Sequence, residues 1–406
     1  MELQEFWLEN LRRYQTLDQL RKSVFFAGCG VHLERYLSTP QVFSSPHAAP
    51  RLQSFLRVAQ WNIEKGKRFQ PILELLQTDP VLSWADVILL NEADRGMNRS
   101  QNRNVARDLA RALEMSMVFG PAHFELTKGT DEELRLEGEN RESLQGNAVL
   151  SRYPVLETRI VPLPVSFEPY EFHEKRFGRR NCLWARLQLK GGSLWVGSVH
   201  LELRNTQRCR ARQMEHILKN LPGGGKEPCL LGGDLNTNSF ARGTTWRTWH
   251  SISRLLLCPP ARMKRRLFHP ELGSEPLFSI LKSSGFEWEG LNSYQETARA
   301  PLDSLEESRL LPASVLNVMR RRLEPYHGYL CFKLDWLLGK NIRALGSGEV
   351  RDADTSIASV GPGCVQVENS GPERISDHLP IYADIDLAYP DISSQRRTCR
   401  MEREQK

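Results

Sequence analysis

From Phe55 onward, the chain alternates short apolar runs with longer segments in which apolar residues recur every three or four positions. The first pattern is typical of buried β-strands and the second of amphipathic helices. The predicted strands are residues 55–63, 86–91, 147–152, 182–189, 194–200, 229–235, 332–338 and 379–385. The predicted helices are residues 70–78, 102–114 and 206–220, the last ended by the run 222–225, Pro-Gly-Gly-Gly. This alternation predicts an α/β fold.

Four segments stand apart from this pattern. Residues 1–50 are predicted to form a helical N-terminal extension that ends in a Ser/Pro/His-rich connector, and residues 389–406 a charged C-terminal tail. The acidic stretch 127–142 is predicted to be a solvated loop, and residues 239–330 an insertion. The catalytic domain is then expected to span residues 55–388, with the insertion inside it.

Composition narrows the class of protein. Apolar residues make up 40% and charged residues 26% of the 406 positions, which is the balance of a soluble globular protein. No run approaches the roughly 18 apolar residues of a membrane span, and the first five residues, Met-Glu-Leu-Gln-Glu, do not form a secretory signal. The eight cysteines are scattered without a Cys-x-x-Cys pair. We therefore expect a cytoplasmic protein without a disulfide framework.

The positive charge of the chain is local. Lys and Arg number 55 and Asp and Glu 49, which gives a net charge of +6. Residues 241–270 hold seven basic residues and no acid, so the remainder carries 48 minus 49, or −1. Two further basic clusters, within residues 175–180 and 204–212, lie beside predicted strands.

Polar and ionisable side chains gather where the predicted strands begin or end. One such residue alone is more often a turn former or a structural histidine, but here they recur at strand after strand. This set contains carboxylates, amides and two histidines but no cysteine. Such groups are the ligands and catalytic residues expected where Mg²⁺ or Mn²⁺ acts on a phosphate ester. The set comprises Asn62, Glu64, Glu92, Asn147, His200, Asp234, Asn236, Asp335, Asp377 and His378.

These residues stand in seven ordered motifs that together resemble the endonuclease/exonuclease/phosphatase superfamily. The resemblance implies a four-layer α/β/β/α sandwich, with one active site at strand ends between two packed sheets. It also implies a divalent-metal-dependent phosphoesterase that uses an activated water. The motifs are Trp61-Asn62-Ile63-Glu64, Leu90-Asn91-Glu92, Gly146-Asn147 with the following Ala-Val-Leu-Ser-Arg-Tyr-Pro, Val199-His200-Leu201, Gly233-Asp234-Leu235-Asn236, Leu334-Asp335-Trp336 and Ser376-Asp377-His378-Leu379-Pro380.

The resemblance assigns metal binding to four residues. Glu92 corresponds to the principal metal ligand, and Asn62 and Glu64 complete the shell around metal and phosphate. Asp377 is a second metal ligand or a water-orienting carboxylate. Glu64 has the alternative interpretation of a surface residue beside two lysines, since relatives often have Asp at this position.

The resemblance assigns the chemical steps to five further residues. Asp234 orients or deprotonates the attacking water, and Asn236 donates to the phosphate. His378 binds a phosphate oxygen or takes a proton, with Asp335 fixing its tautomer and charge. His200 stabilises or protonates the leaving oxygen.

Two further amides, Asn147 and Asn91, belong to these motifs. Asn147 either contacts the phosphate directly or belongs to a Gly-Asn turn before a strand. Asn91 replaces the glutamine usual in the superfamily, and its side chain is one methylene shorter. A hydrogen bond from this neighbour of Glu92 is therefore not predicted.

The substrate must be inferred from the segments between the motifs. Trp246, Arg247 and Trp249 follow Asn236 closely and are predicted to bind substrate. Basic residues interleaved with aromatics suit nucleic acid, while the same residues at helical spacing suit an anionic membrane or an ordinary packed helix. We favour a nuclease acting on DNA or RNA, with no obligate protein partner. The alternatives are a lipid or inositol phosphate phosphoesterase with peripheral membrane contact and a catalytically silent binding scaffold.

Overall fold

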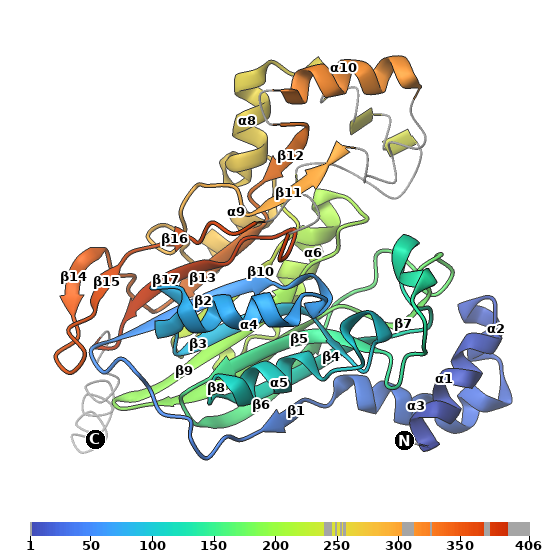
Figure 1. Ribbon diagram of the computed structural model, residues 1–406, viewed down its shortest axis with the longest axis horizontal. Coiled ribbons are helices and arrows are strands. Elements are labelled where there is room, and N and C mark those ends of the chain that lie inside the picture. The colour runs from blue at the N-terminus through green and yellow to red at the C-terminus, as the bar shows by residue number, and fades with distance from the viewer. Residues whose placement is uncertain are drawn as a thin grey trace, which may run out of the picture.

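The computed structural model describes residues 2–238, 246–247, 250–251, 254, 257–302, 312–324, 327–368 and 374–388. Two β-sheets form its centre (Figure 1). The larger sheet has the strand order β1 (Gln41–Phe43), β4 (Ser116–Glu125), β5 (Leu144–Ser151), β3 (Val87–Arg95), β2 (Phe55–Asn62), β17 (Ile381–Asp386) and β16 (Gly363–Cys364), with β7 (Arg176–Gly178) paired to β4. The smaller sheet has the order β13 (Asp335–Lys340), β10 (Cys229–Asp234), β9 (Gly192–His200), β8 (Asn181–Leu189) and β6 (Val155–Pro162).

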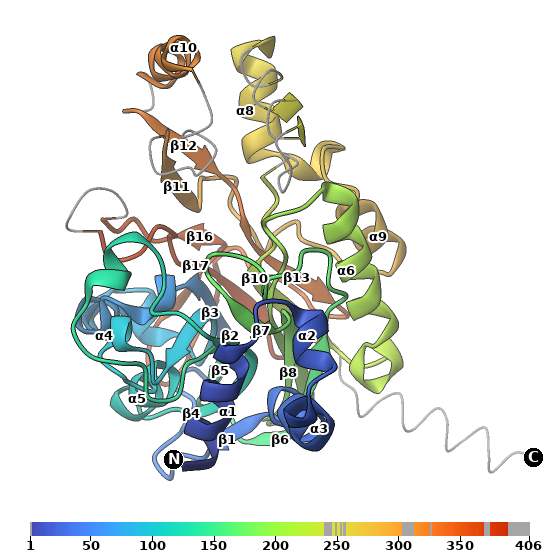
Figure 2. The same ribbon diagram turned by 90° about the vertical axis from the view of Figure 1, so that its right-hand side faces the viewer.

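Helices cover the outer face of each sheet. Figure 2 shows α4 (Phe69–Thr78) and α5 (Val105–Ala112) on one side of the strands, and α6 (Gln207–Lys219) and α9 (Leu277–Ser283) on the other. The predicted α/β/β/α sandwich is therefore confirmed. All three predicted helices are present, and the predicted strands have counterparts in the two sheets.

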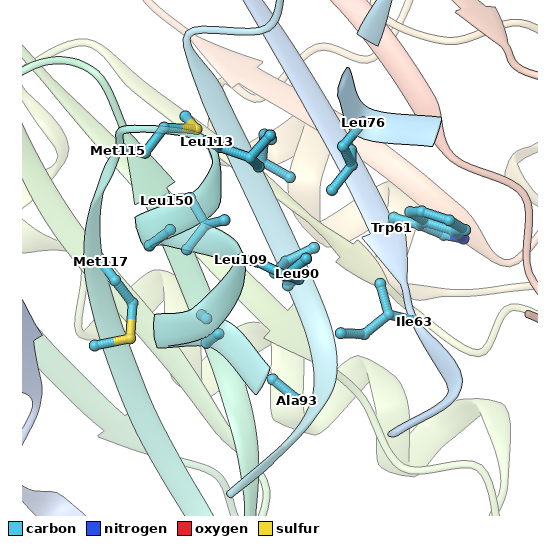
Figure 3. Close-up of a cluster of buried hydrophobic side chains, with 14 of the residues drawn as sticks. Trp61, Ile63, Leu76, Leu90, Ala93, Leu109, Leu113, Met115, Met117 and Leu150 are labelled. Atoms are coloured by element: carbon cyan, nitrogen blue, oxygen red, sulfur yellow. The ribbon is translucent and has the colours of Figure 1, made fainter. Parts of the chain in front are cut away.

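Three apolar layers hold the sandwich together. Between the sheets, residues such as Leu56 and Leu89 pack against Val196 and Leu337. The α4 and α5 side is filled around Trp61 (Figure 3). The α6 and α9 side contains four buried tryptophans, which cluster with helical Met, Ile, Leu and Phe residues. Strands buried on both faces explain the near-continuous apolar runs of β2, β3 and β10.

Two long strands were not predicted, for different reasons. β4 contains a Gly-Pro pair, which is a turn signal, and the structure accommodates Pro121 at an irregularity in the pairing with β5. β6 is an edge strand with several exposed positions, so its apolar content is low. The predicted strand 332–338 is split, because β12 (Tyr329–Phe332) pairs outside the sandwich while β13 joins β10.

The N-terminal extension packs against one end of the larger sheet. It contains α1 (Glu2–Arg13), α2 (Leu17–Arg21) and α3 (Val24–Ser38), and the predicted connector includes β1, which pairs with β4. Trp7 and Leu11 share a buried cluster with Phe124 of β4 and Phe177 of β7. The extension is thus part of the packed structure of the catalytic domain.

The segment predicted as one insertion divides into two parts. Helix α9 packs against α6 as part of the sandwich. The other part contains α8 (Pro260–Phe268), β11 (Ala298–Pro301), α10 (Ala313–Leu323) and β12, which enclose a small apolar core of their own. In Figure 1 these elements stand above the two sheets.

The acidic stretch 127–142 is only partly the solvated loop that was predicted. Most of its side chains are exposed, but Glu133 is buried and forms ion pairs with Lys65 and Arg99. Within the described residues, no helix has the length and apolar character needed to cross a bilayer. The seven cysteines in that part of the chain are all free.

The close approach of β4 and β5 at Gly146 predicts that a larger side chain there destabilises the fold. A Cβ at Gly146 would lie 2.2 Å from the carbonyl oxygen of Gly120, a backbone atom that cannot rotate away. We expect Gly146→Ala to lower the free energy of unfolding by about 1–3 kcal/mol, as overpacking typically does. Urea denaturation measures this change. Gly191→Ala is the matched control, because a Cβ there meets nothing within 4 Å; equal stability of the two variants would contradict the prediction.

Candidate active site

Strand pairing aligns the predicted site residues in rows. β10 lies between parallel β9 and antiparallel β13, and Asp234 is the register partner of both His200 and Asp335. In the other sheet, Asn62 of β2 is the partner of Asn91 on β3. Register partners project from the same face of a sheet, so each row presents its side chains together. The two rows meet across the sandwich at Asp234.

Glu92 is directed into the site by an irregularity in β3. Its φ is 57°, and the pairing of β3 with β5 shifts between Leu90 and Ala93. Such bulges re-aim side chains next to functional sites. The amide of Asn62 donates to Oε1 of Glu92 at 3.4 Å and to Oδ2 of Asp234 at 3.2 Å. Asn62 therefore connects the predicted metal ligand with the predicted water-orienting carboxylate.

Asp234 is the most densely contacted carboxylate of the site. Its Oδ1 accepts from the backbone N–H of Asn236 at 2.9 Å, and its Oδ2 lies 3.2 Å from Nε2 of His200. Burial raises the pKa of Asp234, but His200 and His378 outweigh burial and hold this pKa well below its usual range. Asp234 is thus ionised at neutral pH.

His378 is held between two carboxylates. Its Nδ1 lies 2.8 Å from Oδ2 of Asp335, and its Nε2 lies 3.8 Å from Oδ2 of Asp234. The backbone of the loop is fixed by Ser376, whose hydroxyl donates to the carbonyl of Asn62 and accepts from the N–H of His378. Burial lowers the pKa of His378, but Asp335 and Asp234 outweigh it and hold this pKa well above its usual value.

Asp377 and Glu64 form a second acidic group. The backbone N–H of Asp377 donates to Oε2 of Glu64 at 3.2 Å. Glu64 is buried and pairs through Oε1 with Lys67 at 2.7 Å and with Arg374 at 2.5 Å, so it is not the surface residue of the alternative interpretation. Burial, together with the negative charges of Glu64 and Glu92, raises the pKa of Asp377 to about 6. This concentration of negative charge favours a bound cation.

Asn91 has a role that the sequence analysis did not predict. Its Oδ1 accepts from Gln60 Nε2 at 3.1 Å and from the backbone N–H of Asp234 at 2.8 Å. Its Nδ2 lies within 3.2 Å of Asn147 Oδ1, Ser198 Oγ and the carbonyl of Val199. The shorter amide thus makes several hydrogen bonds, a point that the resemblance left open.

Asn147 lies within β5, so the interpretation as a turn residue was wrong. Its Nδ2 donates to the carbonyl and side-chain oxygens of Asn181 at 3.0 and 3.1 Å, and its Oδ1 accepts from Asn91. The amide is committed to protein partners. The structure therefore favours a supporting position for Asn147 over the predicted direct phosphate contact.

Two more supporting residues were missed. Gln60 is fully buried and donates to Asp335 Oδ1 at 3.1 Å. Thr297 is also buried, and its hydroxyl accepts from the backbone N–H groups of Leu334 and Asp335 at 3.0 Å each. A polar residue inside the apolar run of β2 was a usable signal for Gln60, whereas Thr297 lies in a segment with no motif.

The predicted substrate residues of the segment after Asn236 are only partly placed. Trp246 is 79% exposed and Arg247 is also exposed, and Trp249 lies outside the described residues. A cavity of about 340 Å³ adjoins the site instead. Glu64, Glu92 and Asp377 line it, together with cations from the other two basic clusters, namely Arg176, Arg179, Arg180 and Arg204.

Sequence comparison identifies the family of the chain. The profile of the Endonuclease/Exonuclease/phosphatase family matches residues 59–378, which contain every predicted metal and catalytic residue. The chain belongs to this family. No curated protein matches the sequence.

Several solved structures resemble this member of the family. An endonuclease/exonuclease/phosphatase from Beutenbergia cavernae is 18% identical, with a TM-score of 0.49 and coverage of 82% of this chain and 72% of that chain. The human Nocturnin catalytic domain with bound sulfate is 15% identical, with a TM-score of 0.43 and coverage of 86% and 97%. D. rerio TDP2 with a single-strand DNA product is 15% identical, with a TM-score of 0.38 and coverage of 82% and 99%.

A cluster of oxygen and nitrogen donors in this family member fits a metal ion. Ligand atoms of Asp234, Asp335 and His378 lie within 4.8 Å of one another. The carboxylates of Glu64, Glu92 and Asp377 line the adjoining cavity and add negative charge beside this cluster.

The Asp335–His378 pair generates a prediction on protonation. In metal-free protein, we expect the ring of His378 to remain protonated at pH values well above the ordinary value of about 6.5. Asp335→Asn removes the principal stabilising charge and should move this titration to lower pH. A pH series of ¹⁵N NMR spectra of the histidine rings measures the pKa. Asp354→Asn, at an exposed position, is the control; an unchanged titration in Asp335→Asn would contradict the assignment.

Proposed function

We propose that the protein is a divalent-metal-dependent phosphodiesterase that hydrolyses nucleic acid by in-line attack of water. The observation that carries this proposal is the meeting of Asn62, Glu92 and Asp234 with the hydrogen-bonded Asp335–His378 pair, within the residues that the family profile matches. The family consists of metal-dependent phosphoester hydrolases. No predicted acidic or histidine position in this site has been lost, which argues against a silent binding scaffold.

Mg²⁺ or Mn²⁺ would be held by Glu92 and Asp377, with Glu64 and Asn62 supporting them. When bound, the ion neutralises charge on the non-bridging phosphate oxygens. Ionised Asp377 is required for this role, and the raised pKa of its carboxyl to about 6 leaves it mainly ionised at neutral pH. Arg374 and Lys67 hold Glu64 in place from the protein side.

The chain supplies the remaining groups. Asp234 is ionised and buried, and it accepts the proton of the attacking water or orients that water. The protonated ring of His378 donates toward a phosphate oxygen, because a cation there stabilises the negative charge of the transition state. Asn236 uses one amide N–H for the carbonyl of Leu201 at 2.9 Å and keeps the other for the phosphate. His200 orients Asp234 and is available to the leaving oxygen.

Basic helices above the site support nucleic acid as the substrate. Helices α8 and α10 contain no acidic residue, and Figure 2 shows them on opposite sides of the top of the molecule. Phosphate backbones attract such clustered cations without requiring a defined sequence. The exposed basic side chains are Arg262, Lys264 and Arg265 of α8 and Arg320, Arg321 and Arg322 of α10.

A lipid or inositol phosphate ester is the second candidate substrate. Trp246 is 79% exposed and Leu257 is 81% exposed, both close in sequence to the basic helix α8. Exposed apolar residues beside basic ones suit an anionic membrane surface. The lipid and nucleic-acid candidates use the same catalytic groups. They differ in what the basic helices bind, an anionic membrane surface or a phosphate backbone.

Loss of either central carboxylate should abolish most activity. We expect Glu92→Gln and Asp234→Asn each to lower kcat for bis(p-nitrophenyl) phosphate with Mg²⁺ or Mn²⁺ by about 10²-fold or more, the usual cost of removing a group that serves the transition state. Release of p-nitrophenolate measures the rate. Glu157→Gln, at an exposed position on β6, should retain wild-type activity. Wild-type rates in the two site variants would refute the proposed mechanism.

Binding of nucleic acid should depend on α8 and on salt. We expect the triple variant Arg262→Gln/Lys264→Gln/Arg265→Gln to bind a labelled single-stranded oligonucleotide more weakly, and to reduce the slope of log affinity against log salt by about 2. Fluorescence anisotropy without divalent metal measures both. Lys190→Gln in the β8–β9 turn, at the end of β9 opposite His200, is the control. Absent binding at about 50 mM salt, together with co-sedimentation on anionic vesicles, would favour the lipid substrate instead.

A further inference from the structure

The cavity beside the site is lined by two chemically different sets of side chains. One set consists of the carboxylates of Glu64, Glu92 and Asp377. The other consists of two aromatic rings, Phe167 and Phe172, both half-buried. Arginines of the 175–180 cluster also line the cavity. A ligand that fills the cavity therefore places an anionic group and an apolar group in contact with one continuous wall.

The two aromatic rings of the wall belong to a cluster of planar groups. The rings of Phe167 and Phe172 meet edge to face with centroids 5.2 Å apart. The guanidinium of Arg204 lies over Phe172, 4.2 Å from its centroid, and the ring of His173 lies tilted against Phe172 with centroids 3.9 Å apart. Aromatic rings and guanidinium planes are the groups on which an unpaired base stacks, and arginine adds a cation–π contribution. A flat, unsaturated ring that joins this cluster is therefore a suitable ligand for this part of the wall.

The loop that carries both rings is fixed from behind by the N-terminal extension. The hydroxyl of Tyr170 donates to the carbonyl of Leu11 at 2.5 Å, and Lys175 donates to the carbonyl of Arg12 at 3.2 Å. The backbone N–H of Leu17 donates to Glu171 at 3.2 Å. Because these hydrogen bonds already hold the loop in place, ligand binding needs to order few side chains or backbone groups there. The entropic cost of binding is correspondingly small.

Acidic side chains of the cavity wall are already paired with cations. Glu133 lies 3.2 Å from Nζ of Lys65, and Glu202 lies 3.6 Å from Nε of Arg180. This pairing keeps the wall from repelling the negative charge of a phosphodiester.

We propose that Phe167 and Phe172 form a subsite for an unpaired nucleobase of the nucleotide that carries the scissile phosphate. The proposal rests on the proposed function and narrows its substrate to single-stranded nucleic acid or frayed ends. The volume of about 340 Å³ lies at the small end of the range for small-molecule sites, about 300–1,000 Å³, and suits one nucleotide. The arginines that line the same cavity supply positive charge next to an anionic ligand.

Two synthetic phosphodiesters separate the subsite from the chemistry. Thymidine 5′-(p-nitrophenyl phosphate) carries a base, whereas methyl p-nitrophenyl phosphate does not, and both release p-nitrophenolate. We expect wild-type kcat/KM to be higher for the thymidine ester. Phe172→Ala should raise KM for the thymidine ester by about 5- to 150-fold, since stacking on one aromatic side chain contributes about 1–3 kcal/mol. The same variant should leave kcat/KM for the methyl ester within about twofold.

Conservative variants distinguish stacking from folding. Phe172→Tyr retains the ring and should restore KM for the thymidine ester, whereas Phe172→Leu retains only apolar volume and should not. Equal losses on both esters in Phe172→Ala, or an unchanged KM for the thymidine ester, would overturn the subsite. A larger loss on a lysophospholipid than on the thymidine ester would also overturn it. If wild type hydrolyses neither ester with Mg²⁺ or Mn²⁺, the proposed function itself fails.

Discussion

The site depends on one buried amide that joins the two sheets. Asn91 accepts from the N–H of Asp234 and donates to acceptors on β5 and β9, so it fixes the end of the larger sheet against the end of the smaller one. Inside a protein, a buried polar group without partners costs about 1–3 kcal/mol, which makes such a network intolerant of displacement. Since Glu92 follows Asn91 directly, the same constraint sets the separation between the carboxylates of Glu92 and Asp234, for which we propose metal binding and water orientation.

A second layer of buried charge supports the metal side of the site. Arg99 is fully buried and forms two hydrogen bonds with Asp94 at 2.8 and 3.0 Å, and it also contacts Glu133 at 3.2 Å. Glu133 in turn pairs with Lys65, one of the cations that hold Glu92 ionised. Removing one member of a buried network leaves an uncompensated charge at a cost of about 3–5 kcal/mol. The acidic loop therefore contributes to the electrostatics of catalysis even though most of it faces water.

The sequence predicted this site at its strand ends and failed where contacts cross between sheets. His200, Asp234 and Asp335 were identifiable because each terminates or begins an apolar run, and strand register then brings them together. The hydrogen bonds of Asn91 depend on how two sheets stack, which no local pattern encodes. The basic stretch after Asn236 was assigned to the substrate because of its composition. The cavity beside Glu92 is lined by other arginines, which come from β7, the β7–β8 connection, the segment after β9 and the segment before β17, and only the fold brings these segments together.

Among the elements that stand above the two sheets, β11 and the residue before it are hydrogen-bonded to the segments that carry Asp335 and His378. The residue Ala298 of β11 bridges to His378, Arg299 N–H donates to the carbonyl of Asp377 at 3.1 Å, and Thr297 accepts from the N–H of Asp335. Both members of the Asp335–His378 pair are therefore held by one short strand of the insertion. Through these hydrogen bonds the insertion helps to position the pair, together with the two sheets.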